Sequence, residues 1–238
     1  MTSKGTLYLI PALLGPVAPE RVLPSFNMDI IFRLNEFIVE EERTARRFLR
    51  SIGYAKSFDE VTLHLLNEHT KDEETSAYLQ SAKDGHDLGL LSEAGTPCIA
   101  DPGSAIVRQA HLAGITVVPL VGPNSLLLAL MASGMNGQNF TFHGYLPAKT
   151  DERAQKLKML EKEAYSQHGT QLFIETPYRN MPLLESIIQH CRPSTLLCIA
   201  CDITLETEFI ATKTVGEWKK KLPALGKRPT VFLIAEGY

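Results

Sequence analysis

Short apolar runs alternate with segments of helical periodicity along the whole chain, and this alternation most constrains the fold. It is typical of α/β proteins, in which a helix connects each strand to the next strand of a parallel sheet. In the first half, strands are expected at 6–10, 37–39, 61–66, 88–91 and 115–120, and helices near 25–36, 41–51, 72–84 and 104–113. This half therefore predicts a parallel sheet that is complete near residue 120.

The second half begins with an apolar helix. Pro123 and Asn124 or Ser125 are typical of a helix start, and Gly134 is a typical stop. The following strands are expected at 140–146, 171–176, 195–203 and 230–236, with a strand-like "TEFIATKTV" and with helices near 151–164, 180–190 and Trp218. Strands follow one another closely near the end, which indicates a mixed sheet. We predict two α/β domains, residues 1–119 and 120–238.

The composition is that of an ordinary soluble globular protein, with 44% hydrophobic and 21% charged residues. The formal net charge of −3 provides no global basic field for nucleic acid, although a local basic face is compatible with it. No apolar run approaches the ~18 residues of a membrane span, and the N-terminus lacks a signal-peptide pattern. Four cysteines suggest reduced thiols, so we expect a cytoplasmic protein without a membrane segment.

"CIAC" at 198–201 has the spacing of a redox or zinc motif. It lies inside the apolar run "LLCIACDI", however, and the chain offers no second pair of ligands at similar spacing. We therefore interpret Cys198 and Cys201 as core residues and expect no metal site. Dinucleotide, Walker A, HExxH, GxSxG and EF-hand patterns are also absent.

"LLSEAGTPCIADPGS", residues 90–104, is longer than a strand-to-helix connection requires. One interpretation makes Asp101 a helix N-cap followed by proline at the first helical position. The other makes the segment a ligand-binding loop, since Gly95 permits close backbone approach and ligands of open parallel sheets bind beyond the carboxyl ends of strands.

The same residues resemble the S-[DE]-A-G-x-P-x-[IV]-[AS]-D-P-G signature of the tetrapyrrole methylase superfamily, and most of all its branch of ribosomal small-subunit RNA 2′-O-methyltransferases. Further similar motifs follow in the family's order, and together they cover nearly the whole chain. They are "VVPLVGPNS" (117–125), "ASGM" (132–135), "FHGYLPAK" (142–149), "ETPYR" (175–179) and "AEG" (235–237), with weaker matches at "LYLIP" (7–11) and "EEERTARRFL" (40–49).

The resemblance implies two α/β domains with a cofactor cleft between them, which binds S-adenosylmethionine through several loops. By position, the cofactor-binding residues would be Pro11, Ser92, Glu93, Ala94, Gly95, Ile99, Asp101 and Ser125, followed by Thr176, Pro177 and Ile203. The methyl group of a sulfonium is already electrophilic, so the protein mainly orients the reactants. A hydroxyl nucleophile also needs a proton acceptor; Glu93, Asp101 and Glu175 lie on suitable loops, and each could equally be structural.

The chain departs from the family pattern at three places. The first loop reads "PALLGP", where the RNA-modifying branch has threonine-proline and glycine-asparagine. In "CDITLETEF" (201–209), Asp202 and Leu205 replace the family's glutamate and lysine. The sequence also ends at Tyr238, without the small C-terminal extension of that branch.

A basic stripe is expected on the helix near 41–51, where four arginines are spaced i, i+3, i+4 and i+7. They are Arg43, Arg46, Arg47 and Arg50. The stripe suits RNA phosphates, but it could also be a solvated helix end that follows the acidic residues Glu40 to Glu42.

Three functions remain open at this point: methylation of RNA at a ribose 2′-hydroxyl of ribosomal RNA, C-methylation of a tetrapyrrole (corrin or porphyrin), and cofactor binding without catalysis. We expect the first, an enzyme whose partner is ribosomal RNA or the small subunit. The resemblance also implies a homodimer. The apolar residues of "NMDIIFRLNEFI" (27–38) could contribute to it, or they could pack within the first domain.

Overall fold

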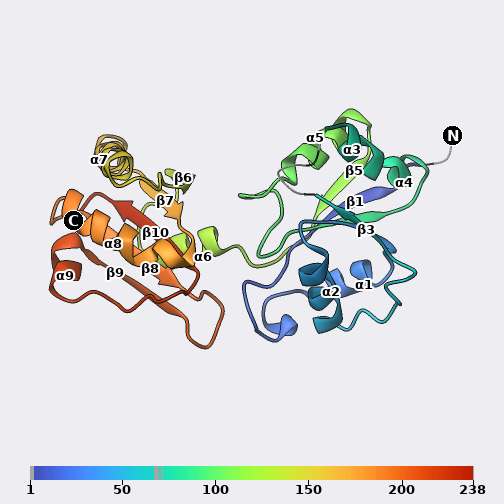
Figure 1. The fold of residues 1–238 in the computed structure, drawn as a ribbon, viewed down its shortest axis with the longest axis horizontal. Coiled ribbons are helices and arrows are strands. Elements are labelled where there is room, and N and C mark those ends of the chain that lie inside the picture. Colours follow the sequence, from blue (N-terminus) through green and yellow to red (C-terminus); the bar gives the residue numbers. More distant parts are fainter. Residues whose placement is uncertain (1–2, 67–69, 71, 238) are drawn as a thin grey trace. The chain divides into compact units, whose positions relative to one another are not determined.

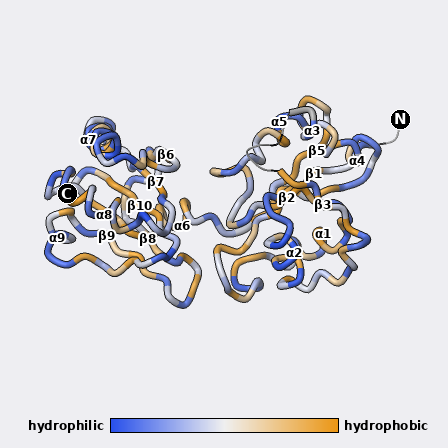
Figure 2. The backbone as a smooth tube through the Cα atoms, in the orientation of Figure 1, coloured by the Kyte–Doolittle hydropathy of each residue, from blue (hydrophilic) through white to orange (hydrophobic). Residues whose placement is uncertain are grey.

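The computed structural model describes residues 3–66, 70 and 72–237 and divides the chain into two compact units, Met1–Asn124 and Ser125–Tyr238 (Figure 1). Each unit has a central sheet and its own hydrophobic core, and apolar segments occur in the strands and helices of both units (Figure 2). The division after residue 124 lies five residues beyond the boundary at residue 119 that the sequence suggested. The segment that follows the last strand of the first sheet therefore stays with the first unit.

The first unit contains a five-stranded sheet with the order β3-β2-β4-β1-β5, in which all neighbours are parallel. Its strands are β1 (Thr6–Ile10), β2 (Glu36–Val39), β3 (Thr62–Leu65), β4 (Leu88–Leu91) and β5 (Thr116–Pro119). Its helices are η1 (Pro19–Arg21), α1 (Ser25–Ile31), α2 (Glu42–Ser51), α3 (Asp72–Tyr78), α4 (Gln80–Lys83) and α5 (Ser104–Leu112). The parallel sheet expected from the alternating pattern is therefore present.

β4 shows why this sequence forms a central strand. All four of its residues are buried, as expected for a parallel strand covered on both faces. A Cβ atom at Gly89 would lie 2.5 Å from Cδ1 of Ile10 and 2.9 Å from Cδ1 of Phe37. Glycine is therefore required there so that neighbouring strands can bring their large side chains over β4.

Two helices of the first unit are shorter than predicted. The helix expected to reach residue 36 ends at Ile31, where the N–H groups of Arg33 and Leu34 donate to carbonyls three residues earlier instead of four. The Leu34 carbonyl accepts from the Tyr54 hydroxyl (2.6 Å) and from Lys56 Nζ (3.2 Å). The helix expected over 72–84 is interrupted at Leu79, which is buried and leaves helical geometry.

The apolar residues near α1 pack within the first unit. Ile30, Ile31 and Leu34 are buried in the core, and Phe32 alone of the four is partly exposed. The excess of apolar residues in 27–38 therefore fills the unit's own core, and it no longer supports a dimer contact.

The second unit has a mixed sheet, as the closely spaced strands predicted. Its strand order is β6-β7-β10-β8-β9; β6 and β7 are parallel, and the other neighbours are antiparallel. The strands are β6 (Phe140–Tyr145), β7 (Thr170–Ile174), β8 (Leu196–Cys201), β9 (Phe209–Thr214) and β10 (Thr230–Ala235). The helices are α6 (Ser125–Ser133), α7 (Thr150–Gln167), η2 (Pro177–Arg179), α8 (Asn180–His190) and α9 (Val215–Lys220).

The "CIAC" motif is part of β8, and Cys198 and Cys201 are both fully buried free thiols. Burial raises the pKa of both thiols, which disfavours the reactive thiolate. The interpretation of these cysteines as core residues is confirmed. No helix among the described residues is long and apolar enough to cross a bilayer.

Candidate functional site: loops at the carboxyl edge of the first sheet

The loops that follow β1, β2, β4 and β5 gather at one edge of the first sheet. Because these strands are parallel, their carboxyl ends lie at the same edge, which is where open α/β sheets bind ligands. The longest of these connections is residues 92–103, here called the 92–103 loop, which contains six of the residues expected to bind cofactor. A seventh, Pro11, is buried directly after β1.

Gly95 fixes the 92–103 loop to the segment after β1. Its N–H donates to the Ala12 carbonyl (3.2 Å), and its own carbonyl accepts from the Ala12 N–H (2.8 Å) and from the Ser92 hydroxyl (2.9 Å). Gly95 has φ +75°, and a Cβ atom would lie 3.2 Å from Leu14 Cδ2 and 3.4 Å from the Pro123 oxygen. The close approach expected at Gly95 is thus to neighbouring loops of the same unit.

Side chains connect the same loop to the segments after β2 and β5. Oε1 of Glu40 accepts a hydrogen bond from the backbone N–H of Glu93 (3.1 Å). Nδ2 of Asn124 donates to the hydroxyl of Thr96 (2.6 Å). Three separate connections therefore hold the loop, while Glu93, Ala94 and Ile99 remain exposed. An anchored backbone lowers the entropy that a loop loses on contact with a ligand.

Asp101 organises the end of the loop, and the N-cap interpretation of this residue is wrong. The helix α5 begins at Ser104, and its N-cap, Gly103, makes no side-chain capping bond. Oδ1 of Asp101 instead accepts from the N–H groups of Cys98 (2.9 Å) and Gly103 (2.8 Å). Cys98 and Ala100 have φ of 69° and 64°, so the carboxylate stabilises a backbone that L-residues seldom adopt.

The electrostatics of this edge favour a cation. Burial raises the pKa of Glu40, and the nearby carboxylates of Asp101 and Glu93 raise it further, against the opposing effect of the Glu93 N–H. Oδ2 of Asp101 is buried without a hydrogen-bond partner among the described residues. Three carboxylates with an unsatisfied buried oxygen would be stabilised by a positively charged ligand group.

Glu40 is the residue that the sequence analysis missed at this edge. In the sequence, Glu40 stands out only as the first of three glutamates before the arginine stripe. Its position directly after the β2 strand is the signal that could have identified it, since side chains at that position face the ligand-binding edge.

In the second unit, the sequence-predicted residues occupy two places. Ser125 is the first residue of α6. Thr176 and Pro177 follow β7, and Ile203 follows β8; because both strands are antiparallel to β10, these two loops lie at the same edge of the second sheet. Ile203 is buried, while Thr176 and Pro177 are partly exposed.

Glu175 is engaged as a structural carboxylate. Its Oε1 accepts from the Thr176 N–H (2.7 Å) and from Nε (2.8 Å) and Nη2 (2.5 Å) of Arg179. The pair of the buried Glu175 and the partly exposed Arg179 fixes the 175–179 turn. Oε2 of Glu175 is buried without a hydrogen-bond partner among the described residues. The three contacts of Oε1 support the structural alternative for Glu175.

The four arginines of the stripe lie exposed on α2. Arg46 pairs with Glu42 (3.0 Å), and Arg50 donates to the Tyr54 carbonyl (2.5 Å). The guanidinium groups of Arg46 and Arg50 both stack over the ring of Phe58, at 5.3 Å and 4.4 Å from its centroid. Glu41 caps the helix through the N–H groups of Arg43 and Thr44, so the acidic residues do serve the helix start.

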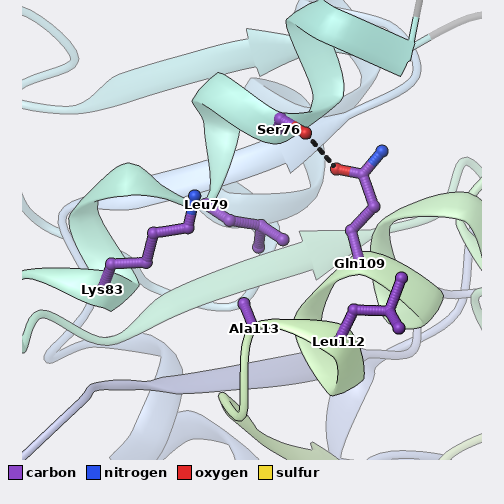
Figure 3. Close-up of a pocket in the computed structure, with 6 residues that line it drawn as sticks. All are labelled: Ser76, Leu79, Lys83, Gln109, Leu112 and Ala113. Carbon is purple, nitrogen blue, oxygen red and sulfur yellow. Dashed lines mark hydrogen bonds between the residues drawn. The ribbon is translucent and has the colours of Figure 1, made fainter.

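A hollow of about 380 Å³ lies elsewhere in the first unit, between the α3–α4 pair and α5 (Figure 3). A hydrogen bond from Ser76 to Gln109 (3.1 Å) crosses it, and none of its residues was predicted to bind a ligand. Its lining residues are Ser76, Leu79, Lys83, Gln109, Leu112 and Ala113. Among the residues that the structure describes, no cluster of His, Cys, Asp and Glu could hold a metal ion.

Cys98 is the one cysteine within the loop cluster. Burial, with the charge of Asp101 as a second cause, raises the pKa of its thiol to about 11. The thiol is therefore protonated at neutral pH and unsuited to nucleophilic catalysis.

Known proteins agree with this architecture. The family model described as Tetrapyrrole (Corrin/Porphyrin) Methylases matches residues 27–219. The Ribosomal RNA small subunit methyltransferase I of Escherichia coli O157:H7 is 31% identical over 239 aligned positions, which cover 99% of this chain and 79% of that protein.

Solved structures share the fold. The methyltransferase CobJ has a TM-score of 0.62 and 19% identity, covering 98% of this chain and 94% of its own. The uroporphyrin-III C-methyl transferase from Thermus thermophilus, complexed with S-adenyl homocysteine, has a TM-score of 0.59 and 15% identity, covering 98% of both chains. With the family match over most of its length, this chain belongs to the tetrapyrrole methylase family.

Proposed function

We propose that this S-adenosylmethionine-dependent methyltransferase methylates ribosomal RNA of the small ribosomal subunit at a ribose 2′-hydroxyl. The observation that carries the proposal is the 31% identity with a ribosomal RNA small subunit methyltransferase over 99% of the chain. Similarity over the full length includes both units and the loops that carry the predicted cofactor residues. The cytoplasm, where ribosomes assemble, is the location that this function requires.

The first unit supplies the main proposed cofactor contacts. The donor set fits, because S-adenosylmethionine carries a sulfonium and an ammonium cation, and the loop edge contains Glu40, Glu93 and Asp101 with a buried carboxylate oxygen lacking a partner among the described residues. The proposed contacts in this unit are Pro11, Ser92, Glu93, Ala94, Gly95, Ile99 and Asp101, with Glu40 added. In the second unit, Ser125, Thr176, Pro177 and Ile203 are the further candidates.

The cofactor supplies an electrophilic methyl group when bound. The chain then needs to hold the ligand in one orientation, and positioning alone can lower a barrier by about 7–11 kcal/mol in favourable cases. The three connections from Ala12, Glu40 and Asn124 to the 92–103 loop keep the backbone fixed for that purpose.

The exposed arginine stripe of α2 is the proposed phosphate contact of the first unit. Arg46 and Arg50 are held over Phe58, so less side-chain entropy is lost when they meet a phosphate. Arg43 and Arg47 extend the stripe on the same helix. Because each neutralised phosphate releases counterions, RNA binding through this stripe should weaken steeply with salt.

The test uses small ribosomal subunits from a strain of the source organism that lacks the gene. Purified enzyme and S-adenosylmethionine with a tritiated methyl group are added, and the RNA is digested to nucleosides. The proposal predicts one labelled 2′-O-methylnucleoside. Label that appears in a corrin or porphyrin precursor offered in parallel, but not in RNA, would support the tetrapyrrole alternative. Absence of transfer to either, with intact cofactor binding, would support a non-catalytic homologue.

We also propose a homodimer, which is the assembly that the family resemblance implies. Light scattering at micromolar concentration should give about twice the chain mass of 26.4 kDa. A mass near that of one chain would contradict the dimer and would leave a single arginine stripe to contact the RNA.

A further inference from the structure

Tyr178 is the most exposed aromatic side chain among the described residues, with 74% of its surface accessible. It belongs to the short helix η2, directly after Thr176 and Pro177. Nζ of Lys227 lies 4.7 Å from the centroid of its ring. An exposed aromatic ring with an adjacent cation is the pairing that single-stranded nucleic acids contact, through base stacking and phosphate binding.

Both side chains project from turns that are held in place. On the side of Tyr178, the buried Glu175 pairs with Arg179, and Asn180 begins α8. On the side of Lys227, Arg228 pairs with Asp202 (2.6 Å) and also donates to the Thr207 carbonyl. The backbone around the exposed pair is therefore rigid although the pair itself faces solvent.

A buried amide joins these two turns. Nδ2 of Asn180, a fully buried residue, donates to the Arg228 carbonyl (2.7 Å) and approaches the Thr230 hydroxyl (3.3 Å). Asn180 and Arg228 are 48 residues apart, so tertiary contacts place Tyr178 beside Lys227. Such preorganisation reduces the entropy lost when a ligand binds.

The two other aromatic–cation pairs in the described part of the second unit have a structural explanation. Trp218, which Lys213 covers at 4.7 Å, is buried and donates from its indole to the Leu197 carbonyl. Tyr165, beside Arg192, is hydrogen-bonded to Ser194 and Thr195. For the side chains of Tyr178 and Lys227, by contrast, their mutual contact is the one interaction within the described part of the chain.

We infer that Tyr178 and Lys227 form a nucleotide-binding contact for the RNA substrate, in which an unpaired base stacks on the Tyr178 ring and Lys227 binds a flanking phosphate. This inference rests on the proposed function. It adds a second RNA contact, in the second unit, to the arginine stripe of the first. Stacking tolerates any base, so the pair would increase affinity without specifying sequence.

The test measures binding of radiolabelled small-subunit ribosomal RNA and methyl transfer to small subunits lacking the modification. Tyr178→Ala should raise the Kd for RNA, and the KM for subunits, by about fivefold or more, the loss of one stacked base. Tyr178→Phe should keep nearly all of the affinity because it keeps the ring. Lys227→Ala should reduce the slope of log Kd against log salt by about one phosphate contact, whereas Tyr178→Ala should leave that slope unchanged.

Arg192→Ala is the matched control, because it also removes a cation that lies beside a tyrosine, Tyr165. Arg192 precedes β8, whereas Ile203 follows it, so the control lies at the opposite end of that strand. The affinity for S-adenosylmethionine should be the same in all variants, which reports intact folding. Equal RNA affinities for Tyr178→Ala and wild type, with wild-type methylation of RNA intact, would overturn this inference alone. Failure of the wild type to bind or methylate RNA would overturn it together with the proposed function.

Discussion

Two loops of this protein, one in each unit, contain an aspartate that accepts hydrogen bonds within a segment of left-handed backbone. The two aspartates differ in the groups that donate to them. Asp101 in the first unit and Asp202 in the second each follow a strand edge and lie in a segment with left-handed residues: Cys98 and Ala100 in one, Asp202 itself and Thr204 in the other. The carboxylate of Asp202 accepts hydrogen bonds from Arg228 Nε (2.6 Å) and from the Thr207 hydroxyl (2.7 Å).

Asp101 receives only backbone N–H groups on one oxygen, and its second oxygen is buried without a partner among the described residues. The charged groups near Glu40 that raise its pKa are also negative; they are the carboxylates of Asp101 and Glu93. The chain supplies a cation, Arg228, for the carboxylate of Asp202, whereas no ion pair to Glu40, Glu93 or Asp101 is found among the described residues. The difference indicates that folding completes the 202–208 loop, and it leads us to propose that a bound ligand completes the 92–103 loop.

The largest expected effect is on stability. Arg228→Ala leaves the buried carboxylate of Asp202 without its cation, and the free energy of unfolding should fall by about 3 kcal/mol. Urea unfolding, monitored through the fluorescence of Trp218 in the same unit, measures this loss. Lys227→Ala, which changes an exposed neighbour, is the control and should alter stability by no more than about 0.5 kcal/mol. Equal stabilities for both variants would contradict the structural role of the Arg228–Asp202 pair.

The next effect concerns cofactor binding. Gly95→Val places a β-branched residue at φ +75°, with its Cβ within 3.2 Å of Leu14, and the strained loop should bind S-adenosylmethionine about tenfold more weakly. Calorimetry gives the Kd. Gly137→Val is the control, because a Cβ there meets nothing within 4 Å. An unchanged affinity in Gly95→Val would show that the loop serves only as a connector.

Glu40→Gln should weaken cofactor binding without lowering the stability of the ligand-free protein. The amide oxygen can still accept from Glu93, but the charge is lost, so cofactor affinity should fall by about fivefold. The pKa of Glu40 is raised, so its contribution to stability is present below the ordinary carboxyl pKa and is lost as pH rises through the raised value. The ligand-free variant should therefore be as stable as wild type, or slightly more stable, at neutral pH.

A pH titration of cofactor binding completes that test. In wild type, affinity should decrease as pH falls through the raised pKa of Glu40, because the protonated carboxyl no longer attracts a cation. The variant should lack this part of the decrease. Identical pH profiles for the two proteins would contradict a role of Glu40 in cation binding.

The smallest expected effect is a change in the pKa of the Cys98 thiol, which depends on the charge of Asp101. The pKa of the Cys98 thiol is about 11, raised by burial and then by Asp101. Asp101→Asn removes that charge while keeping an oxygen acceptor, so the thiol pKa should fall. The pH dependence of Cys98 alkylation measures it, in a background where Cys191 is replaced by alanine. A thiol pKa that does not move would show that burial alone sets it.

The sequence predicted the elements well because their signals are local. Strand periodicity located β3, and Gly134, at φ +72°, ends α6 as expected. The conformation of the segment after α1 was not predictable in the same way, since its Leu34 carbonyl accepts a hydrogen bond from Tyr54, a residue 20 positions later.

The site was predictable in part for the same reason. The motif of the 92–103 loop identified the segment, but not what holds it: Glu40 lies 53 residues from Glu93, and Arg228 lies 26 residues from Asp202. Asp101 illustrates the error that follows, because Asp-Pro predicts an N-cap, whereas the folded loop uses the carboxylate to support Cys98 and Gly103. Hydrogen bonds and ion pairs between residues far apart in the sequence determine the chemistry at the loop edges of both sheets. A local sequence pattern does not predict these contacts.

The most direct test of this account is a crystal structure of the chain with S-adenosylhomocysteine. We predict that the ligand contacts the 92–103 loop, that Gly95 and Asp101 retain their hydrogen bonds to Ala12, Cys98 and Gly103, and that Glu40 or Asp101 lies near the ligand's ammonium group. A ligand bound away from this loop, for example in the hollow lined by Leu79 and Leu112, would contradict it.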